Sequence, residues 1–110
     1  KGLIKMADKI IMLACSAGMS TSLLVSKMQE AAKEQGKDYE IFAKSVADID
    51  HQFEVEKPDV LMLGPQVAYM KADIQRKCDD AGVPMEVINM TDYGMMNGKN
   101  VLAEAEKIMG

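Results

Sequence analysis

Short apolar runs alternate along the chain with longer segments in which apolar residues recur every three or four positions. The runs at residues 9–14, 39–43, 60–63 and 85–88 have the length and composition of β-strands. The segments at 20–35, 48–55, 67–81 and 100–109 have the periodicity of helices that bury one face. Strands that alternate with helices form a parallel sheet covered on both faces, so the pattern predicts a three-layer α/β/α fold.

The composition of each strand indicates its place in the sheet. The first strand from Ile10 onward and the whole third strand are apolar, as expected of strands buried on both faces, whereas the second partly alternates and is expected near an edge. We therefore expect a flavodoxin-like, four-stranded parallel sheet in the order 2-1-3-4. Such sheets bind ligands beyond the carboxyl ends of their strands, where the strand order reverses. The segment after the first strand should then be flanked by the residues after the third strand, Gly64, Pro65 and Gln66.

Local signals indicate where the helices begin and end. Ser20, Thr21 or Ser22 could cap the first helix, because each side-chain oxygen can accept a hydrogen bond from an unpaired backbone N–H group. Gly36 is expected to end that helix. Residues 89–99 are polar and contain glycines, so they are predicted to form a loop whose part at 90–94 lies at the same end of the sheet as Cys15.

Composition and charge narrow the range of functions. The chain has 110 residues, enough for one domain, which we expect at residues 8–110, with residues 1–7 a leader, an arm or an expression remnant. The formal net charge of -4, without a basic stripe, argues against binding to nucleic acid. Two cysteines and one histidine make neither a disulfide framework nor a metal site, so no metal or cofactor is expected. No apolar run is long enough to span a membrane, and a reducing cytoplasm is the expected location.

Cys15 is the residue that points most directly to chemistry. It follows a buried strand and opens a short loop of small residues that leads into a helix. Unpaired N–H groups and the helix dipole make such a helix start attractive to anions, and a thiol there is expected to ionise near neutral pH. The hypothesis is that Cys15 is a nucleophile toward phosphorus; the alternative is a small buried apolar residue. Cys78 lies in the apolar stripe of a helix and is expected to be structural.

Three stretches resemble a known family. They are residues 15–23 (CSAGMSTSL), residues 63–70 (LGPQVAYM) and Tyr93-Gly94. They are similar to the IIB component of the bacterial phosphoenolpyruvate-dependent sugar phosphotransferase system, lactose/cellobiose (chitobiose) type. The resemblance implies that Cys15 accepts a phosphoryl group from a phosphohistidine of the IIA component. It then passes the group to a sugar, cellobiose, chitobiose or lactose, imported through the membrane component IIC, with which the chain would associate peripherally. It also implies a phosphate cradle made of Ser16, Ala17, Gly18, Met19, Ser20, Thr21 and Ser22.

The same loop resembles that of low-molecular-weight tyrosine phosphatases, in which an arginine follows the cysteine after five residues. Here Thr21 occupies that position and Ser22 follows, and Asp92 alone lies in a loop suited to an acid catalyst. An arginine would stabilise the transferring phosphoryl group by charge-assisted hydrogen bonds. Its replacement by threonine favours a relay over a phosphatase or an arsenate-reductase-like enzyme. A binding module without catalysis is a further alternative.

Partners of a relay should contact a small, partly apolar rim around Cys15. Met19 and Tyr69 are predicted to belong to that rim. For Tyr69, half-buried packing on a helix is the favoured alternative.

Overall fold

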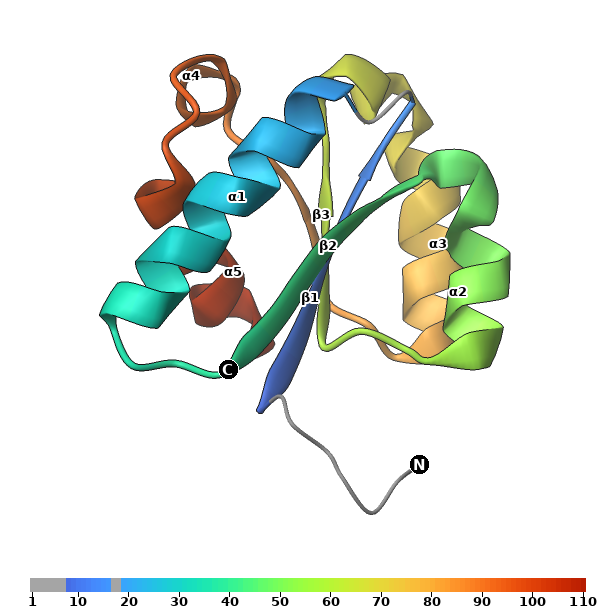
Figure 1. Cartoon of the computed structure of the whole chain (residues 1–110). Coiled ribbons are helices and arrows are strands. Elements are labelled where there is room, and N and C mark those ends of the chain that lie inside the picture. Colours follow the sequence, from blue (N-terminus) through green and yellow to red (C-terminus); the bar gives the residue numbers. More distant parts are fainter. Residues whose placement is uncertain (1–7, 17–18) are drawn as a thin grey trace.

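The computed structural model describes residues 8–16 and 19–110. A parallel four-stranded sheet lies within these residues, formed by β1 (Lys9–Cys15), β2 (Tyr39–Ser45), β3 (Val60–Leu63) and β4 (Met85–Val87). The strands are hydrogen-bonded in the order β2-β1-β3-β4, and each neighbouring pair is parallel (Figure 1). The predicted order is confirmed, with β1 and β3 in the centre.

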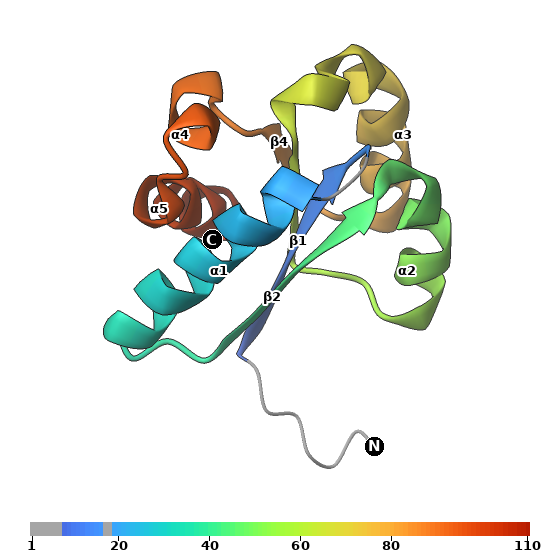
Figure 2. The same cartoon turned by 45° about the horizontal axis from the view of Figure 1, so that its top comes forward.

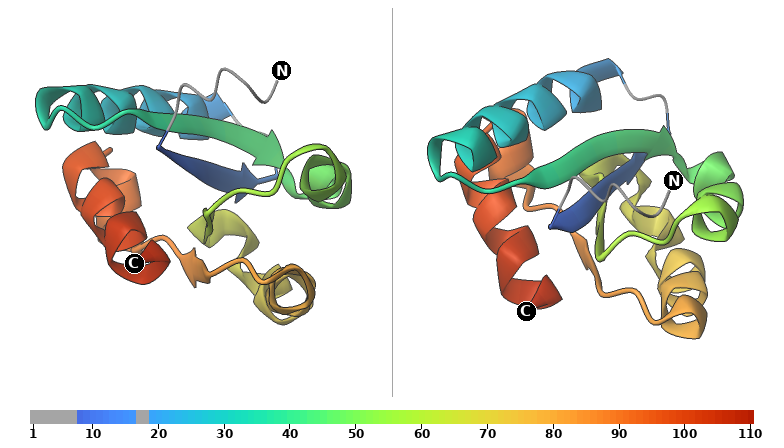
Figure 3. Two further views of the ribbon diagram at one scale, coloured as in Figure 1. Left: turned by 90° about the horizontal axis from the view of Figure 1, so that it is seen from below. Right: turned by 60° about the horizontal axis from the view of Figure 1, so that its bottom comes forward.

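Helices cover both faces of this sheet. On one face lie α1 (Met19–Glu34) and α5 (Gly98–Met109), and on the other lie α2 (Ile49–Val55) and α3 (Lys71–Ala81), as the views in Figure 3 show. The 3₁₀ helices η1 (Val46–Asp48) and η2 (Pro65–Met70) precede α2 and α3. The three-layer α/β/α fold predicted from the alternation of strands and helices is thereby confirmed.

The alternation of side chains along β1 divides the core into two parts. Ile11 and Leu13 pack in a cluster with residues of α1 and α5, whereas Met12 and Ala14 pack in a cluster with residues of α2 and α3. All four residues are fully buried, so β1 is covered on both faces. Burial of an aliphatic side chain of this size stabilises the fold by about 1.5–3 kcal/mol, which explains why the run is apolar throughout.

The backbones of α1 and α5 lie unusually close together at Gly98. A Cβ atom on this residue would lie 2.5 Å from the carbonyl carbon of Lys27 and 2.6 Å from the backbone nitrogen of Met28. Real Cβ atoms do not approach other atoms so closely. The first turn of α5 can therefore pack against α1 only because residue 98 has no side chain.

The prediction of a loop at residues 89–99 is wrong, because this stretch contains a helix, α4 (Met90–Gly94), and the first two residues of α5. Asparagine side chains cap both helices: Asn89 Oδ1 accepts a hydrogen bond of 3.0 Å from the backbone N–H of Asp92, and Asn97 Oδ1 accepts one of 3.1 Å from that of Asn100. Capping residues and glycines are the residues that make a sequence look like a loop. Short capped helices are therefore easily mistaken for loops.

Two further boundaries differ from the predicted ones. Helix α1 begins at Met19, so Ser20, Thr21 and Ser22 lie inside its first turns and none of them is the residue before it, which makes the predicted capping role wrong. The helix predicted at 67–81 starts as η2, and Val67 has φ −114° and ψ 24°, outside the helical region. Gly36 follows α1 in the left-handed conformation, with φ +71°, as predicted.

Candidate functional site

The carboxyl ends of β1 and β3 meet at Cys15 and Gly64. Cys15 is the last residue of β1, and Gly64 directly follows β3. The backbone N–H of Gly64 donates a hydrogen bond of 2.8 Å to the carbonyl oxygen of Ala14. A Cβ atom on Gly64 would lie 3.4 Å from Cys15 Cβ and 3.2 Å from Gln66 Oε1. Cys15 and the side chain of Gln66 thus border the same methyl-sized space, and Pro65 begins η2 beside them.

Cys15 itself is almost fully covered. The residue is 3% exposed, whereas Ser16, which follows it, is exposed. A nucleophile that reacts with a partner protein has to be reached by that partner's phosphorus atom. Any such reaction therefore requires that the sulfur of Cys15 first becomes accessible to that phosphorus atom.

The predicted cradle is only partly described. Ala17 and Gly18 lie outside the described residues, and Met19 and Ser20 begin α1 without a described side chain. Three residues separate the end of β1 from the start of α1, so the first turn of that helix lies near Cys15 (Figure 2). The first N–H groups of a helix lack partners within it, and the dipole is positive there. This end of α1 can accordingly attract a thiolate or a phosphate.

Thr21 lies in this first turn and faces the core. It is the one buried polar residue among the described residues, at 1% exposed, and its hydroxyl lies 3.2 Å from the hydroxyl of Tyr93. Tyr93 belongs to α4, which follows β4 at the same end of the sheet. Sequence reasoning placed Tyr93 at this end of the sheet, within residues 90–94, and the family resemblance also includes it, but neither assigned it a contact. A threonine among apolar helix positions indicates a buried hydroxyl, but the pattern does not identify its partner.

Large apolar side chains lie exposed in the segments that follow β1, β3 and β4. They are Leu23 on α1, Tyr69 on η2, and Met90 and Met95 at the two ends of α4. Tyr69 is 82% exposed, so half-buried packing of Tyr69 is wrong. The predicted rim residue Met19 has no described side chain. One more large apolar residue, Val55 at the end of α2, is exposed among the described residues, so most of these exposed side chains lie in the segments that follow β1, β3 and β4.

Two other side chains of the described residues, Cys78 and Asp92, were candidates for a chemical role. Cys78 is fully buried on α3, and burial raises the pKa of its thiol to about 11, which agrees with a structural role. Asp92 is half-buried, and its carboxylate accepts a hydrogen bond of 3.2 Å from the side chain of Asn100. The described residues contain no group of three or more acidic, histidine or cysteine side chains that could hold a metal. Within the same residues, none of the helices is long and apolar enough to cross a membrane.

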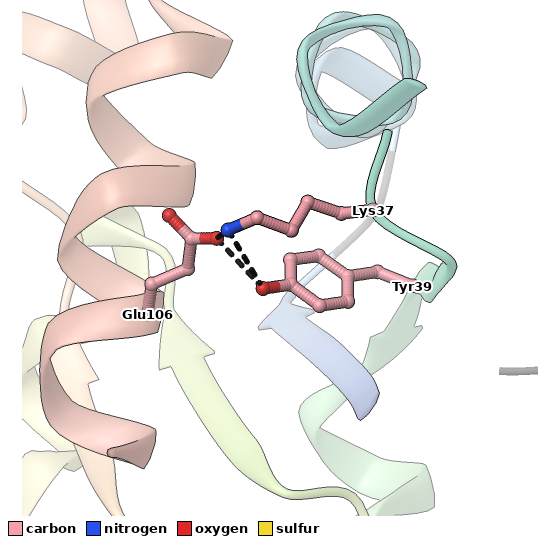
Figure 4. A network of polar contacts seen from close by, with 3 residues as sticks. All are labelled: Lys37, Tyr39 and Glu106. Atoms are coloured by element: carbon pink, nitrogen blue, oxygen red, sulfur yellow. Dashed lines mark hydrogen bonds and ion pairs between the residues drawn. The ribbon is translucent and has the colours of Figure 1, made fainter. Parts of the chain in front are cut away.

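A polar network lies at the end of the sheet opposite to Cys15. Lys37 Nζ lies 2.6 Å from Glu106 Oε2, and the hydroxyl of Tyr39 donates a hydrogen bond of 2.7 Å to the same oxygen (Figure 4). Burial alone would raise the pKa of Glu106, but the hydrogen bonds from Lys37 and Tyr39 outweigh it and hold that pKa below its usual value. The network ties α5 to the start of β2, far along the sheet from Cys15, and its role is structural.

Comparisons with known proteins identify the family of this chain. The model of the family described as "PTS system, Lactose/Cellobiose specific IIB subunit" matches residues 10–104. A galactose-specific EIIB component of the phosphotransferase system from Lactococcus lactis subsp. cremoris is 67% identical over 107 residues, 94% of this chain and 99% of that protein. A cellobiose-specific EIIB component from Lactococcus lactis subsp. lactis is 66% identical over 107 residues, again 94% of this chain and 99% of that protein.

A solved structure agrees with these relatives. The solution structure of a cellobiose-specific phosphotransferase IIB component from Borrelia burgdorferi superimposes with a TM-score of 0.76 at 36% identity, over 92% of this chain and 91% of that one. Sequence and fold point to the same assignment. The chain therefore belongs to the lactose/cellobiose-specific IIB family of the sugar phosphotransferase system.

Proposed function

We propose that Cys15 carries the phosphoryl group of this phosphotransferase component. It would receive the group from a phosphohistidine of the IIA component and pass it to a sugar that enters through the membrane component IIC. The observation that carries the proposal is the position of Cys15, at the carboxyl end of a central strand and separated by three residues from the start of α1. The buried Cys78, with its raised pKa, is unsuited to the role.

The transfer takes place in two in-line steps. In the first, the Cys15 thiolate attacks phosphorus, an S–P bond forms, and the P–N bond breaks with its electron pair returning to the histidine nitrogen. In the second, a sugar hydroxyl oxygen attacks phosphorus, and the S–P bond breaks to regenerate the thiolate. The hydroxyl proton goes to a base of the membrane partner. Backbone N–H groups at the start of α1 hold the phosphoryl oxygens in both steps.

The absence of a nearby arginine suits a relay better than a phosphatase. The chain has a single arginine, Arg76, which lies on α3 in an exposed ion pair with Asp73. The cradle position that an arginine occupies in the phosphatases is taken by Thr21, whose hydroxyl lies against Tyr93. Without fixed positive charge, attack by water on the S–P bond is slow, so the group is kept for its acceptor.

The apolar rim of Leu23, Tyr69, Met90 and Met95 is the proposed contact surface for both partners. Flexible methionines suit a surface that binds two different proteins in turn. The binding is expected to be transient, because each partner must leave before the next can bind. Contact with a partner also has to give its phosphorus atom access to the nearly covered Cys15.

We assign the choice of sugar to the membrane component IIC. The chain is almost equally similar to a relative named for galactose and to one named for cellobiose. The specificity of the system would then follow from the IIC component with which this chain acts. Sugars of the galactose, lactose, cellobiose and chitobiose class are the proposed acceptors.

Intact-mass measurement tests the proposal. The chain is incubated with phosphoenolpyruvate, the general phosphotransferase proteins and a IIA component of the same sugar system. We expect the mass to rise by one phosphoryl group in the wild type and in Cys78→Ala, and to stay unchanged in Cys15→Ser. Loss of the phosphoryl group in Cys78→Ala, or its retention in a folded Cys15→Ser variant, would refute the assignment to Cys15.

A further inference from the structure

The hydroxyl pair of Thr21 and Tyr93 joins two elements at the site end of the molecule. Thr21 is in the first turn of α1, Tyr93 is in α4, and the two oxygen atoms lie 3.2 Å apart. Both residues are buried, at 1% and 7% exposed, and Tyr93 belongs to the apolar cluster between the sheet and the helices α1 and α5. A buried hydroxyl without a partner would be costly, so each residue constrains the position of the other.

Helix α4 depends on such contacts for its position. It has five residues, fewer than a helix needs to be stable by itself. A cavity of about 210 Å³ lies beside it, lined among others by Asn89, Asp92 and Val101. Packing on that side is therefore incomplete, and the buried side chain of Tyr93 is a principal contact of α4 with the core.

The orientation of the first turn of α1 matters directly for Cys15. The influence of a helix dipole and of the unpaired N–H groups falls off within one turn, and Thr21 is the third residue of the helix. We propose that Tyr93 is a positioning residue, which through Thr21 holds the first turn of α1 in the orientation that activates Cys15. This inference builds on the proposed function, because it explains how the nucleophile of the relay is kept reactive.

A role in packing alone makes a different prediction. If the two hydroxyls contribute only to packing and stability, replacing both by apolar groups of similar shape leaves the reactivity of Cys15 unchanged. If they orient the first turn, the same double replacement leaves the fold stable and alters the reactivity of Cys15. The double variant Thr21→Val/Tyr93→Phe separates the two roles.

The test measures the rate of alkylation of Cys15 by iodoacetamide across a range of pH, with the modified residue identified by peptide mass. We expect the profiles of Tyr93→Phe, Thr21→Val and the double variant to shift to higher pH by about half a unit. This corresponds to a roughly threefold lower rate at fixed pH, as expected for a weakened helix dipole. Thr21→Ser, which keeps the hydroxyl, should retain the wild-type profile.

Tyr39→Phe is the matched control, because it also removes a tyrosine hydroxyl with a hydrogen bond, but at the other end of the sheet. It should lower stability and leave the alkylation profile unchanged. A folded double variant with the wild-type profile, or a Thr21→Ser profile shifted as far as that of Thr21→Val, would overturn the proposal. The assay uses no phosphate, so a failure of phosphoryl transfer to Cys15 would be seen separately, in the intact mass.

Discussion

The backbone N–H of Gly64 donates a hydrogen bond to the carbonyl oxygen of Ala14, which joins β3 to β1 at the residue before Cys15. Gly64 has φ −63° and ψ 142°, a conformation that alanine adopts without strain. An added methyl group would nevertheless lie 3.2–3.4 Å from three neighbours, among them Cys15 Cβ. The position thus restricts side-chain size next to Cys15 while leaving the backbone unconstrained.

Gly64→Ala is expected to change the reactivity of Cys15 more than it changes stability. The gain from a less flexible unfolded chain, about 0.4–1 kcal/mol, offsets much of the crowding. The displaced Cys15 should react with iodoacetamide at a rate severalfold different from that of the wild type. Urea unfolding and alkylation kinetics measure the two effects.

Gly36→Ala is the control, because φ is +71° there and the space is open. We expect the reverse result, a loss of about 1 kcal/mol in the free energy of unfolding and an unchanged rate of alkylation.

Gly98→Ala is expected to destabilise the protein by about 3 kcal/mol, because the new methyl group would overlap the backbone of α1 at Lys27 and Met28. The effect is measured as a lower midpoint of urea unfolding. Gly94→Ala is the control, since a Cβ there meets no atom within 4 Å. Equal stability of the two variants would mean that α5 does not pack against α1 as closely as described.

The network at Glu106 predicts a loss of stability in acid. Its pKa is lowered in the folded protein, so its contribution to stability is present above the usual value of 4.5 and is lost as the pH falls through the lower, folded value. Glu106→Gln should therefore cost on the order of 1 kcal/mol at pH 7 and much less at the acid end of this window. Thermal unfolding of both proteins at pH 7 and below pH 4 measures this difference. Glu54→Gln, on the exposed surface of α2, should behave as the wild type at both values.

Glu86 is predicted to change stability with pH in the opposite direction from Glu106. Burial first, and then the nearby carboxylate of Glu104, raise the pKa of Glu86 above 4.5. The charged form is disfavoured in the folded protein, so Glu86 contributes more to stability as the pH falls through the raised value. Glu86→Gln should accordingly stabilise the protein at pH 7 by about 0.5 kcal/mol, the scale of a partly exposed charge pair. A lower unfolding temperature of this variant at pH 7 would contradict an unfavourable effect of burial and of Glu104 on the charged Glu86.

Much of the fold could be predicted because its central strands are buried on both faces. After its first residue, Lys9, a strand such as β1 must then be apolar, and its place in the sheet follows from that run. The adjacency of Cys15 and Gly64 follows from the strand order, because both residues end neighbouring parallel strands. The roles of these residues and of the segment from Ser16 to Ser22 in phosphate binding remain predictions.

Other features could not be predicted, for physical reasons. The sequence of α4 predicts a loop, because its asparagine cap and its glycine are also typical of turns. The contact of Thr21 with Tyr93 joins residues 72 positions apart and depends on how α4 is oriented, which no local pattern encodes. The near-complete burial of Cys15 depends in the same way on packing between segments, and it makes access to the sulfur the main requirement of the proposed relay.

The most direct test of the relay is the chemical identity of the phosphorylated residue. The chain has one histidine, His51 on α2, and a phosphoryl group on it would be bound to nitrogen, whereas one on Cys15 would be bound to sulfur. Phosphorus NMR of the chain phosphorylated by its IIA partner distinguishes the two bonds. We predict a single thiophosphate resonance that is absent in Cys15→Ser and unchanged in His51→Gln. A phosphoramidate resonance from the chain after its separation from the IIA partner, or a thiophosphate signal that persists in Cys15→Ser, would contradict the account.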